Sequence, residues 1–309
     1  MWVYIAKRLM WVPVVMLAVS LITFALGTYG PGDPAQVILG SRSTPENVER
    51  LRKQMGLDRP FIVQYGDYIW HAIQGDFGES YTFRGQPVAS LLARKIWVSM
   101  QIGIAATALS VSLGIPLGLL VAYRQGTWVD TTVVSIALLF YSIPVFLSAP
   151  FLIWLLALHF HILPTSGWDG FFSPSLVMPA IVMGLPGVAF VVRLTRSSVL
   201  EVLYQDYIRT ARAKGLPEGI IRFRHVLRNA MIPIVTALGF GLAGLLAGAL
   251  FTETIFGIPG VGRLAIDSLF NRDYPVIMAG TLLGATMFIV ANLVSDLLYV
   301  AVDPRIRYT

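Results

Sequence analysis

The chain has 309 residues, of which 56% are hydrophobic and only 13% charged, against roughly 45–50% and 25% in an average soluble domain. This composition excludes an ordinary soluble globular protein. The net charge of +6 would suit nucleic acid, but long charge-free runs separate the basic residues, so we expect no nucleic-acid partner. The absence of cysteine excludes disulfides and thiolate metal sites.

Six stretches without Asp, Glu, Lys, Arg or His are long enough to cross a membrane as helices, because a bilayer core of about 30 Å needs about 20 apolar residues. They run over residues 9–32, 96–123, 131–158, 170–192, 229–252 and 274–295. The first is longer than the apolar region of a signal peptide, so we expect a retained anchor. The sequence therefore predicts an all-α integral membrane protein with six transmembrane helices.

The distribution of Lys and Arg predicts the direction of these spans. With a cytoplasmic N-terminus, the cytoplasmic pieces hold 13 basic residues, whereas the short outer connections 159–169 and 253–273 hold two. Residues 33–95 hold eight more, but a loop of that length is translocated largely regardless of charge. Both termini are therefore predicted to be cytoplasmic.

The long connection after the first span contains helix signals and is expected to fold outside the membrane. Thr44 is a predicted N-cap before Pro45, and Gly56 closes the helix that follows. A second helix starts near Pro60 and stops at Gly75. We expect a small lid or docking surface; a connector without a role in recognition is the alternative.

The basic loop, residues 193–228, carries eight basic and three acidic residues. Apolar residues repeat at helical spacing up to Lys214, Gly215 is a predicted C-cap, and Pro217 begins another helix. Two short helices that meet at a glycine are therefore expected to project from the membrane. An anchor on anionic lipid is an alternative interpretation of the same charges.

The sequence of this loop resembles the cytoplasmic signature of ABC-importer permeases, and most closely that of the first permease of dipeptide, oligopeptide and nickel importers. The resemblance rests on residues 206–215 and 224–233, and further matches occur in family order at 32–35, 56–60, 75–80, 253–262, 272–275 and 303–305. One departure lies at residues 96–99, where the family usually has a proline and then a threonine. This departure makes the start of the second span uncertain.

The resemblance implies a type I, MetI-like permease with an N-terminal anchor helix (1–32), an extracytoplasmic segment (33–95) and a permease core (96–309). Such a subunit forms half of a translocation pathway in a bacterial or archaeal cell membrane. Its implied partners are a paralogous permease, two cytoplasmic ATPases that bind ATP and Mg²⁺, an external substrate-binding protein and membrane lipid. Peptides, nickel and glutathione remain open as solutes.

The same resemblance assigns candidate site residues. The residues expected to couple the permease to the ATPases are Asp206, Tyr207, Arg209, Thr210, Ala211, Arg212, Ala213, Lys214, Gly215, Arg224, His225, Arg228 and Asn229. Ala211 and Ala213 are expected on a helix that enters an ATPase cleft. The residues expected in an outer gate or loop are Glu253, Phe256, Pro259, Gly260 and Asp273. For Glu253, capping the outer loop and touching the solute are equally open.

Catalytic chemistry is not expected in this chain. It has no phosphate-binding loop ending in Gly-Lys-Ser/Thr, so the energy must come from partners, and no cofactor or metal is predicted. Residues 239–244 fit the dinucleotide fingerprint, but they lie within a predicted span and follow no strand. His159 and His161 lack further nearby ligands, so we expect them to be structural.

Small residues and prolines inside the predicted spans indicate how these helices pack and bend. Close helix packing is expected at the pairs Gly114/Gly118, Gly244/Gly248 and Gly280/Gly284. Bends are expected at Pro144, Pro150, Pro179, Pro186 and Pro233.

Two other function classes compete with the permease. A secondary transporter would carry ion-coupling carboxylates at mid-membrane, and the six stretches contain none. A membrane-anchored scaffold or sensor could use the basic loop but leaves the outer motifs unexplained.

Overall fold

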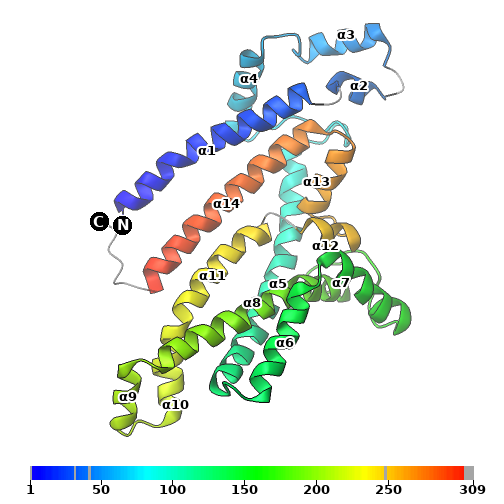
Figure 1. Ribbon diagram of the computed structural model, residues 1–309. Coiled ribbons are helices and arrows are strands. Elements are labelled where there is room, and N and C mark those ends of the chain that lie inside the picture. Colours follow the sequence, from blue (N-terminus) through cyan, green and yellow to red (C-terminus); the bar gives the residue numbers. More distant parts are fainter. Residues whose placement is uncertain (1, 31–32, 41–42, 247–248, 303–309) are drawn as a thin grey trace.

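The computed structural model describes residues 2–30, 33–40, 43–246 and 249–302, and these fold into helices (Figure 1). The first half comprises α1 (Trp2–Tyr29), α2 (Pro34–Leu39), α3 (Pro45–Gln54), α4 (Phe61–Ile73), α5 (Val88–Tyr123), α6 (Trp128–Ser142), α7 (Val145–Leu152) and the π-helix η2 (Ile153–His159). The second half comprises the 3₁₀-helix η3 (Pro174–Leu176), α8 (Val177–Leu203), α9 (Asp206–Ala213), α10 (Glu218–Ile220), the π-helix η4 (Ile221–Leu227), α11 (Arg228–Leu246), α12 (Leu250–Ile255), α13 (Val261–Phe270) and α14 (Tyr274–Val302).

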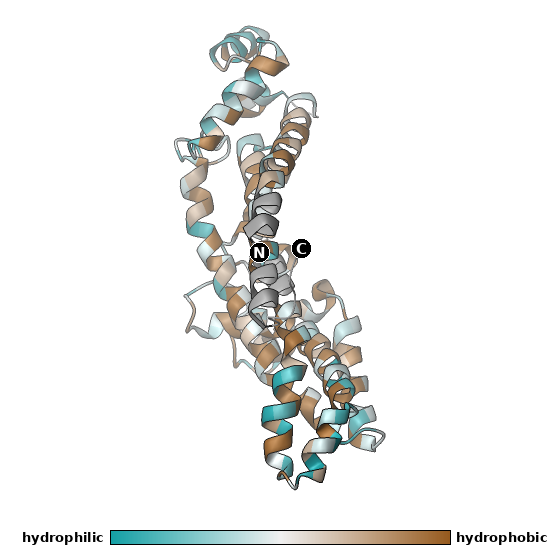
Figure 2. Ribbon diagram, turned by 90° about the vertical axis from the view of Figure 1, so that its left-hand side faces the viewer, coloured by the Kyte–Doolittle hydropathy of each residue, from teal (hydrophilic) through white to brown (hydrophobic). Residues whose placement is uncertain are grey.

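Four helical segments in the described part of the chain are long and apolar enough to cross a membrane. They are Met10–Tyr29, Val88–Tyr123, Pro174–Leu203 and Tyr274–Val294, and they coincide with the first, second, fourth and sixth predicted stretches. The fifth stretch contains α11 and the start of α12, with residues 247–248 outside the described residues. Hydrophilic residues gather at the two ends of the molecule, in α2–α4 and around α9 (Figure 2).

The third predicted stretch, 131–158, is not one helix. It forms α6 and then α7 with η2, and the two parts are bent by 100°. The break lies at Ile143, whose backbone is extended (φ −83°, ψ 117°). A proline restricts the residue before it to such angles and removes a backbone donor, so Pro144 accounts for the bend.

The helix that contains the second predicted span starts before residue 96. Pro87 caps α5 and the helix runs without interruption through residues 96–99 to Tyr123, so its 36 residues extend over about 54 Å. The expected boundary between residues 95 and 96 therefore falls inside a helix. The sequence departs from the family by lacking the proline at this place, and nothing interrupts the helix there.

The closest helix packing joins α5 to α8. A Cβ on Gly114 would lie 2.6 Å from Val191 Cβ, and one on Gly118 would lie 2.5 Å from Thr195 Cβ. Only glycine lets the two backbones approach this closely, which confirms the prediction for this pair. At Gly280 and Gly284 of α14, an added Cβ would meet no atom of the described residues within 4 Å. The pair Gly244/Gly248 is not tested, because Gly248 is outside the described residues.

Helix α4 of the outer segment packs on the end of α1 through aromatic rings. Phe24 lies 5.4–5.6 Å from the rings of Phe61 and Tyr65 in α4, and the Tyr65 hydroxyl lies 2.8 Å from Ser20 Oγ. Local signals in this segment are confirmed, because Thr44 accepts a hydrogen bond from the backbone of Asn47 at the start of α3, and Gly56 has a φ of +66° after it.

Candidate functional site

The knob, formed by α9, α10 and η4, has an apolar core of its own (Figure 1). Ile208 and Ala211 of α9 are 0% and 6% exposed and pack in one cluster with Val199 of α8 and with Ile221 and Val226 of η4. This core joins α9 to the membrane helix before it and to the helix after it. The knob is therefore a packed extension of the bundle.

The outward face of α9 is mostly polar, and Tyr207, 43% exposed, is its large aromatic side chain. Asp206, Arg209, Thr210 and Ala213 are exposed, and Arg209 pairs loosely with Asp206 at 3.8 Å. Ala211 differs from these residues, because its side chain is buried in the knob's own core, whereas the Ala213 side chain is exposed.

Gly215 ends α9 in the left-handed conformation that its sequence position predicted. Its φ is +75°, and its N–H donates to Arg212 while that of Leu216 donates to Ala211. A side chain at this position would meet no atom within 4 Å, so the requirement for glycine is conformational rather than steric.

Replacing Gly215 with valine is therefore expected to destabilise the turn by about 1–2 kcal/mol, the cost of left-handed backbone for an L-residue. Gly219→Val is the matched control, because Gly219 lies in the same knob, also has open space, and has no positive φ. Hydrogen exchange of the α9 amides measures the difference. Equal exchange in the two variants would contradict the conformational requirement.

Polar contacts join α9 to the helices that follow it. Asn229 Nδ2 donates to the Tyr207 hydroxyl at 3.2 Å, and Arg212 pairs with Glu218 at 2.9 Å. Burial raises the pKa of Tyr207, and the bond from Asn229 partly opposes this rise. The remaining expected residues, Lys214, Arg224, His225 and Arg228, lie on the same knob or at the start of α11.

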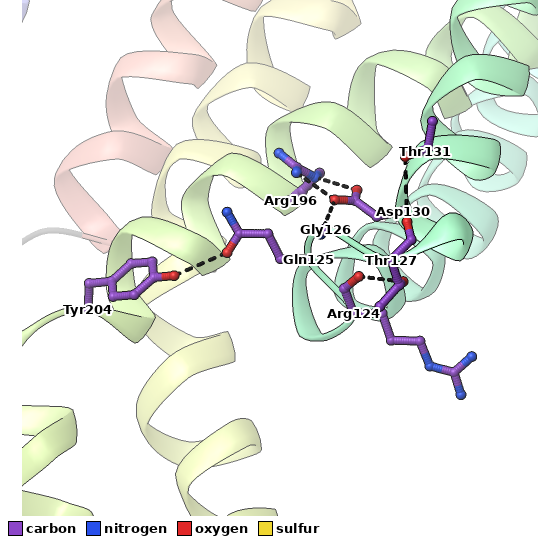
Figure 3. A network of polar contacts seen from close by, with 8 residues as sticks. All are labelled: Arg124, Gln125, Gly126, Thr127, Asp130, Thr131, Arg196 and Tyr204. Carbon is purple, nitrogen blue, oxygen red and sulfur yellow. Dashed lines mark hydrogen bonds and ion pairs between the residues drawn. The ribbon is translucent and has the colours of Figure 1, made fainter.

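A buried ion pair that the sequence analysis did not single out lies at the same end of the bundle as the knob (Figure 3). Arg196 of α8 donates from Nε and Nη2 to the two carboxylate oxygens of Asp130, both at 2.7 Å. Gly126 N–H donates to the same carboxylate at 3.0 Å, and the Asp130 side chain is 8% exposed. The network fixes the α5–α6 turn to the helix that leads into the knob.

Glu253 lies fully buried in the outer loop and is held by groups of this chain. Its carboxylate accepts hydrogen bonds from Ser99 Oγ at 2.6 Å, from Arg263 N–H at 3.0 Å and from Ala249 N–H at 3.2 Å. Ser99 in turn accepts from Val261 N–H at 2.9 Å. Glu253 thus ties α12 and the N-terminus of α13 to α5, and this geometry favours capping over solute contact.

Of the other expected outer residues, Gly260 lies directly against this carboxylate. A Cβ on Gly260 would overlap the Glu253 carboxylate, so the close approach requires glycine. Phe256 is 2% exposed in the apolar cluster next to α7 and α8, and Pro259 is exposed. The loop is therefore built around Glu253, with Pro259 on its surface.

Asp273 anchors the 75–87 turn to the start of α14. It accepts from Ser80 Oγ and, at 3.1 Å each, from the N–H groups of Tyr81 and Thr82. Burial, with a smaller effect of the Asp273 charge, raises the pKa of Tyr81 to about 12. Two motifs noticed separately in the sequence, 75–80 and 272–275, are therefore in direct contact.

The structure brings together no metal-binding set. Within the described residues there is no group of three or more His, Asp or Glu side chains that could hold an ion. His159 stacks on Trp154 at 5.9 Å instead. Residues 239–244 lie in α11 and not at a strand-to-helix turn, unlike a true dinucleotide site.

Two family models match the sequence. The model described as binding-protein-dependent transport system inner membrane component matches residues 114–308. The model of the N-terminal part of such membrane components matches residues 1–91.

Curated relatives are similar over nearly the whole chain. The dipeptide transport system permease protein DppB of Escherichia coli K12 is 42% identical, over 99% of this chain and 98% of the relative. A probable peptide ABC transporter permease protein of Sinorhizobium fredii is 38% identical over the full length of both. Among solved structures, the MetNI methionine ABC transporter in inward-facing conformations matches with a TM-score of 0.55 at 20% identity, covering 69% of this chain and 96% of that chain.

Proposed function

On the premise that the chain belongs to the family of binding-protein-dependent transport system inner membrane components, we propose that it is half of the translocation pathway for dipeptides or oligopeptides. The family makes it a membrane subunit of ABC importers and not an enzyme. Support for the peptide comes from relatives named for dipeptide and peptide transport that align over 98–100% of the chain.

The proposed partners are a paralogous permease, two ATPases that bind ATP and Mg²⁺, and an external binding protein. The observation that carries ATPase docking is α9, a short helix with an exposed polar face and a buried apolar face. The inner face is used by the chain itself, so the outer face, with Ala213, is free for a partner. Segments α2–α4 lie at the opposite end of the molecule (Figure 1) and are the proposed surface for the binding protein.

The knob is proposed to act as a lever on the membrane helices. Its core contacts α8 and α5, and Asn229 joins it to α11. A displacement of α9 by the closing ATPases would therefore move α8 and α11 together, switching the pathway between outward and inward access. Glu253 and Asp273 hold the outer loops as fixed units during such a change.

The proposed topology has six spans, both termini in the cytoplasm, the knob in the cytoplasm and α2–α4 outside. Single cysteines at Ser43 and Ala213, both exposed, can be labelled without background because the native chain has none. In intact cells we expect an impermeant maleimide that crosses the outer membrane to label Ser43→Cys only. Labelling of Ala213→Cys before cell lysis would contradict this topology.

Docking is tested by comparing the two alanines. Ala213→Trp places a large side chain on the exposed face and is expected to cost about 2 kcal/mol of ATPase docking, as for a central interface residue, while leaving the knob folded. Ala211→Trp is expected to disrupt the knob's core instead. Pull-down of the ATPase subunits measures docking, and proteolysis of the knob measures folding.

The lipid-anchor alternative predicts a different result. Ala213→Trp would then retain the ATPases and transport, whereas neutralising Lys214 and Arg209 would weaken membrane attachment in a salt-dependent way. Normal recovery of ATPase subunits with Ala213→Trp would count against α9 as the docking element.

A further inference from the structure

A groove between α6 and α8 combines one cationic end with an apolar remainder. Its volume is about 540 Å³, within the range of small-molecule sites. Arg193, Arg196 and Ser197 line the cationic end, and Val134 and Phe190 line the apolar part. The polarity changes along the groove in the way that it changes along a phospholipid.

One positive charge at this end of the groove is not neutralised. Asp130 neutralises Arg196 through two hydrogen bonds of 2.7 Å. Arg193, one turn earlier in α8, is exposed and makes no ion pair or side-chain hydrogen bond with any described residue. An arginine within a spanning helix needs water, a headgroup or an anion near it.

Arg193 lies at the depth of the predicted membrane boundary. It is the first charged residue after the charge-free stretch 170–192, and Asp130 directly precedes the charge-free stretch 131–158. Trp128, two residues before Asp130, is 78% exposed, as an interfacial aromatic ring would be. The cationic end of the groove therefore lies where lipid phosphates lie, and the apolar part lies where acyl chains lie.

We propose that the α6–α8 groove binds one anionic phospholipid, with its phosphate on Arg193 and part of an acyl chain along Val134 and Phe190. Arg196 turns its remaining N–H groups to the same phosphate, and the Ser197 hydroxyl lies beside it. Charge complementarity and the depth of the groove in the membrane support a lipid as the occupant. This assignment does not depend on which solute is transported. Because α8 continues into the knob, the lipid is bound to the helix that would transmit the lever motion.

The test compares Arg193→Gln with the wild type in the assembled importer. Native mass spectrometry counts bound lipid from micelles doped with phosphatidylglycerol or with phosphatidylcholine. A basic residue near an anionic surface contributes about 1 kcal/mol, so we expect about fivefold weaker phosphatidylglycerol binding and unchanged phosphatidylcholine binding. Arg124→Gln is the matched control, because the Arg124 side chain extends away from the Arg196–Asp130 pair (Figure 3).

A second variant tests the apolar part without changing charge. Val134→Trp fills the groove and is expected to lower the binding of phosphatidylglycerol at this site. If Val134→Trp prevents assembly of the importer, the phosphatidylglycerol binding of Arg193→Gln alone decides whether the lipid site is present. Equal phosphatidylglycerol binding in Arg193→Gln and wild type would overturn the lipid site.

The two other possible occupants give results that also overturn it. A raised KM for peptide uptake with normal lipid binding would assign Arg193 to the solute. Loss of the paralogous permease with normal lipid binding would assign the groove to the subunit interface. Lipid counts are read without transport, so failure of the proposed peptide function leaves this test intact.

Discussion

Replacing Glu253 with alanine is expected to release the outer loop, with a local loss of stability of about 3–5 kcal/mol. Three donors, Ser99 Oγ and the N–H groups of Arg263 and Ala249, lose their acceptor in a buried place. Each unsatisfied buried donor costs about 1–3 kcal/mol, and the space left by the side chain adds to this.

Hydrogen exchange of the amides in residues 260–266 measures the effect. A loss of 3 kcal/mol corresponds to more than about a hundredfold faster exchange where local opening governs it. Glu201→Ala is the matched control, because Glu201 is exposed and its carboxylate makes no hydrogen bond or ion pair with a described residue. If both variants exchange at the same rate, the Glu253 carboxylate does not hold the loop.

Local signals in the sequence predicted most of the helical structure. The Thr44 cap and the glycine at 215 depend on neighbours within a few residues, and the structure confirms them. Four of the six charge-free stretches coincide with single long apolar helices. Pro144 is also a local signal, and the bend predicted there is confirmed, but the sequence did not predict that it would be as large as 100°. The start of α5 was not predicted, because the predicted span began after the charged residues near the N-terminal end of this helix. The helix continues through those charged residues.

The hydrogen bonds that hold Asp273 and Glu253 could not be predicted, because the residues that they join lie far apart in the chain. Ser80 and Asp273 are separated by 193 residues, and Ser99 and Glu253 by 154. A single sequence shows that such residues are present but not which of them meet. For this reason the sequence left Glu253 undecided between capping and solute contact, and it did not show that the Ala211 side chain lies on the buried face of α9.

Asp130 was overlooked because the spans were defined by the absence of charge. That rule placed it one residue outside the third stretch, where a carboxylate looks solvated. The structure instead buries it against Arg196, 66 residues away. A signal was available in the pattern, since Asp130 directly precedes one charge-free stretch and Arg196 lies four residues after another, both on the same predicted side of the membrane.

Removing either partner of this pair is expected to destabilise the protein, whereas removing both is expected to cost less than the sum. Asp130→Ala leaves Arg196, 30% exposed, without its counter-ion, and Arg196→Ala leaves the more buried Asp130 unpaired. Breaking a fully buried pair costs about 3–5 kcal/mol. Because Arg196 is partly exposed, we expect about 2–3 kcal/mol for each single variant.

A double-mutant cycle measures the coupling free energy, for which we expect about 2 kcal/mol. The ion pair between Arg50 and Glu46 is the matched control, since at 3.3 Å and with side chains 65% and 84% exposed it should couple by no more than about 0.5 kcal/mol. The Asp130–Arg196 network is a buried polar contact that joins the α5–α6 turn to α8. We therefore also expect transport to fall in both single variants while ATPase docking on α9 is retained. A coupling free energy as small as that of the exposed pair would show that this contact does not hold α8 in place.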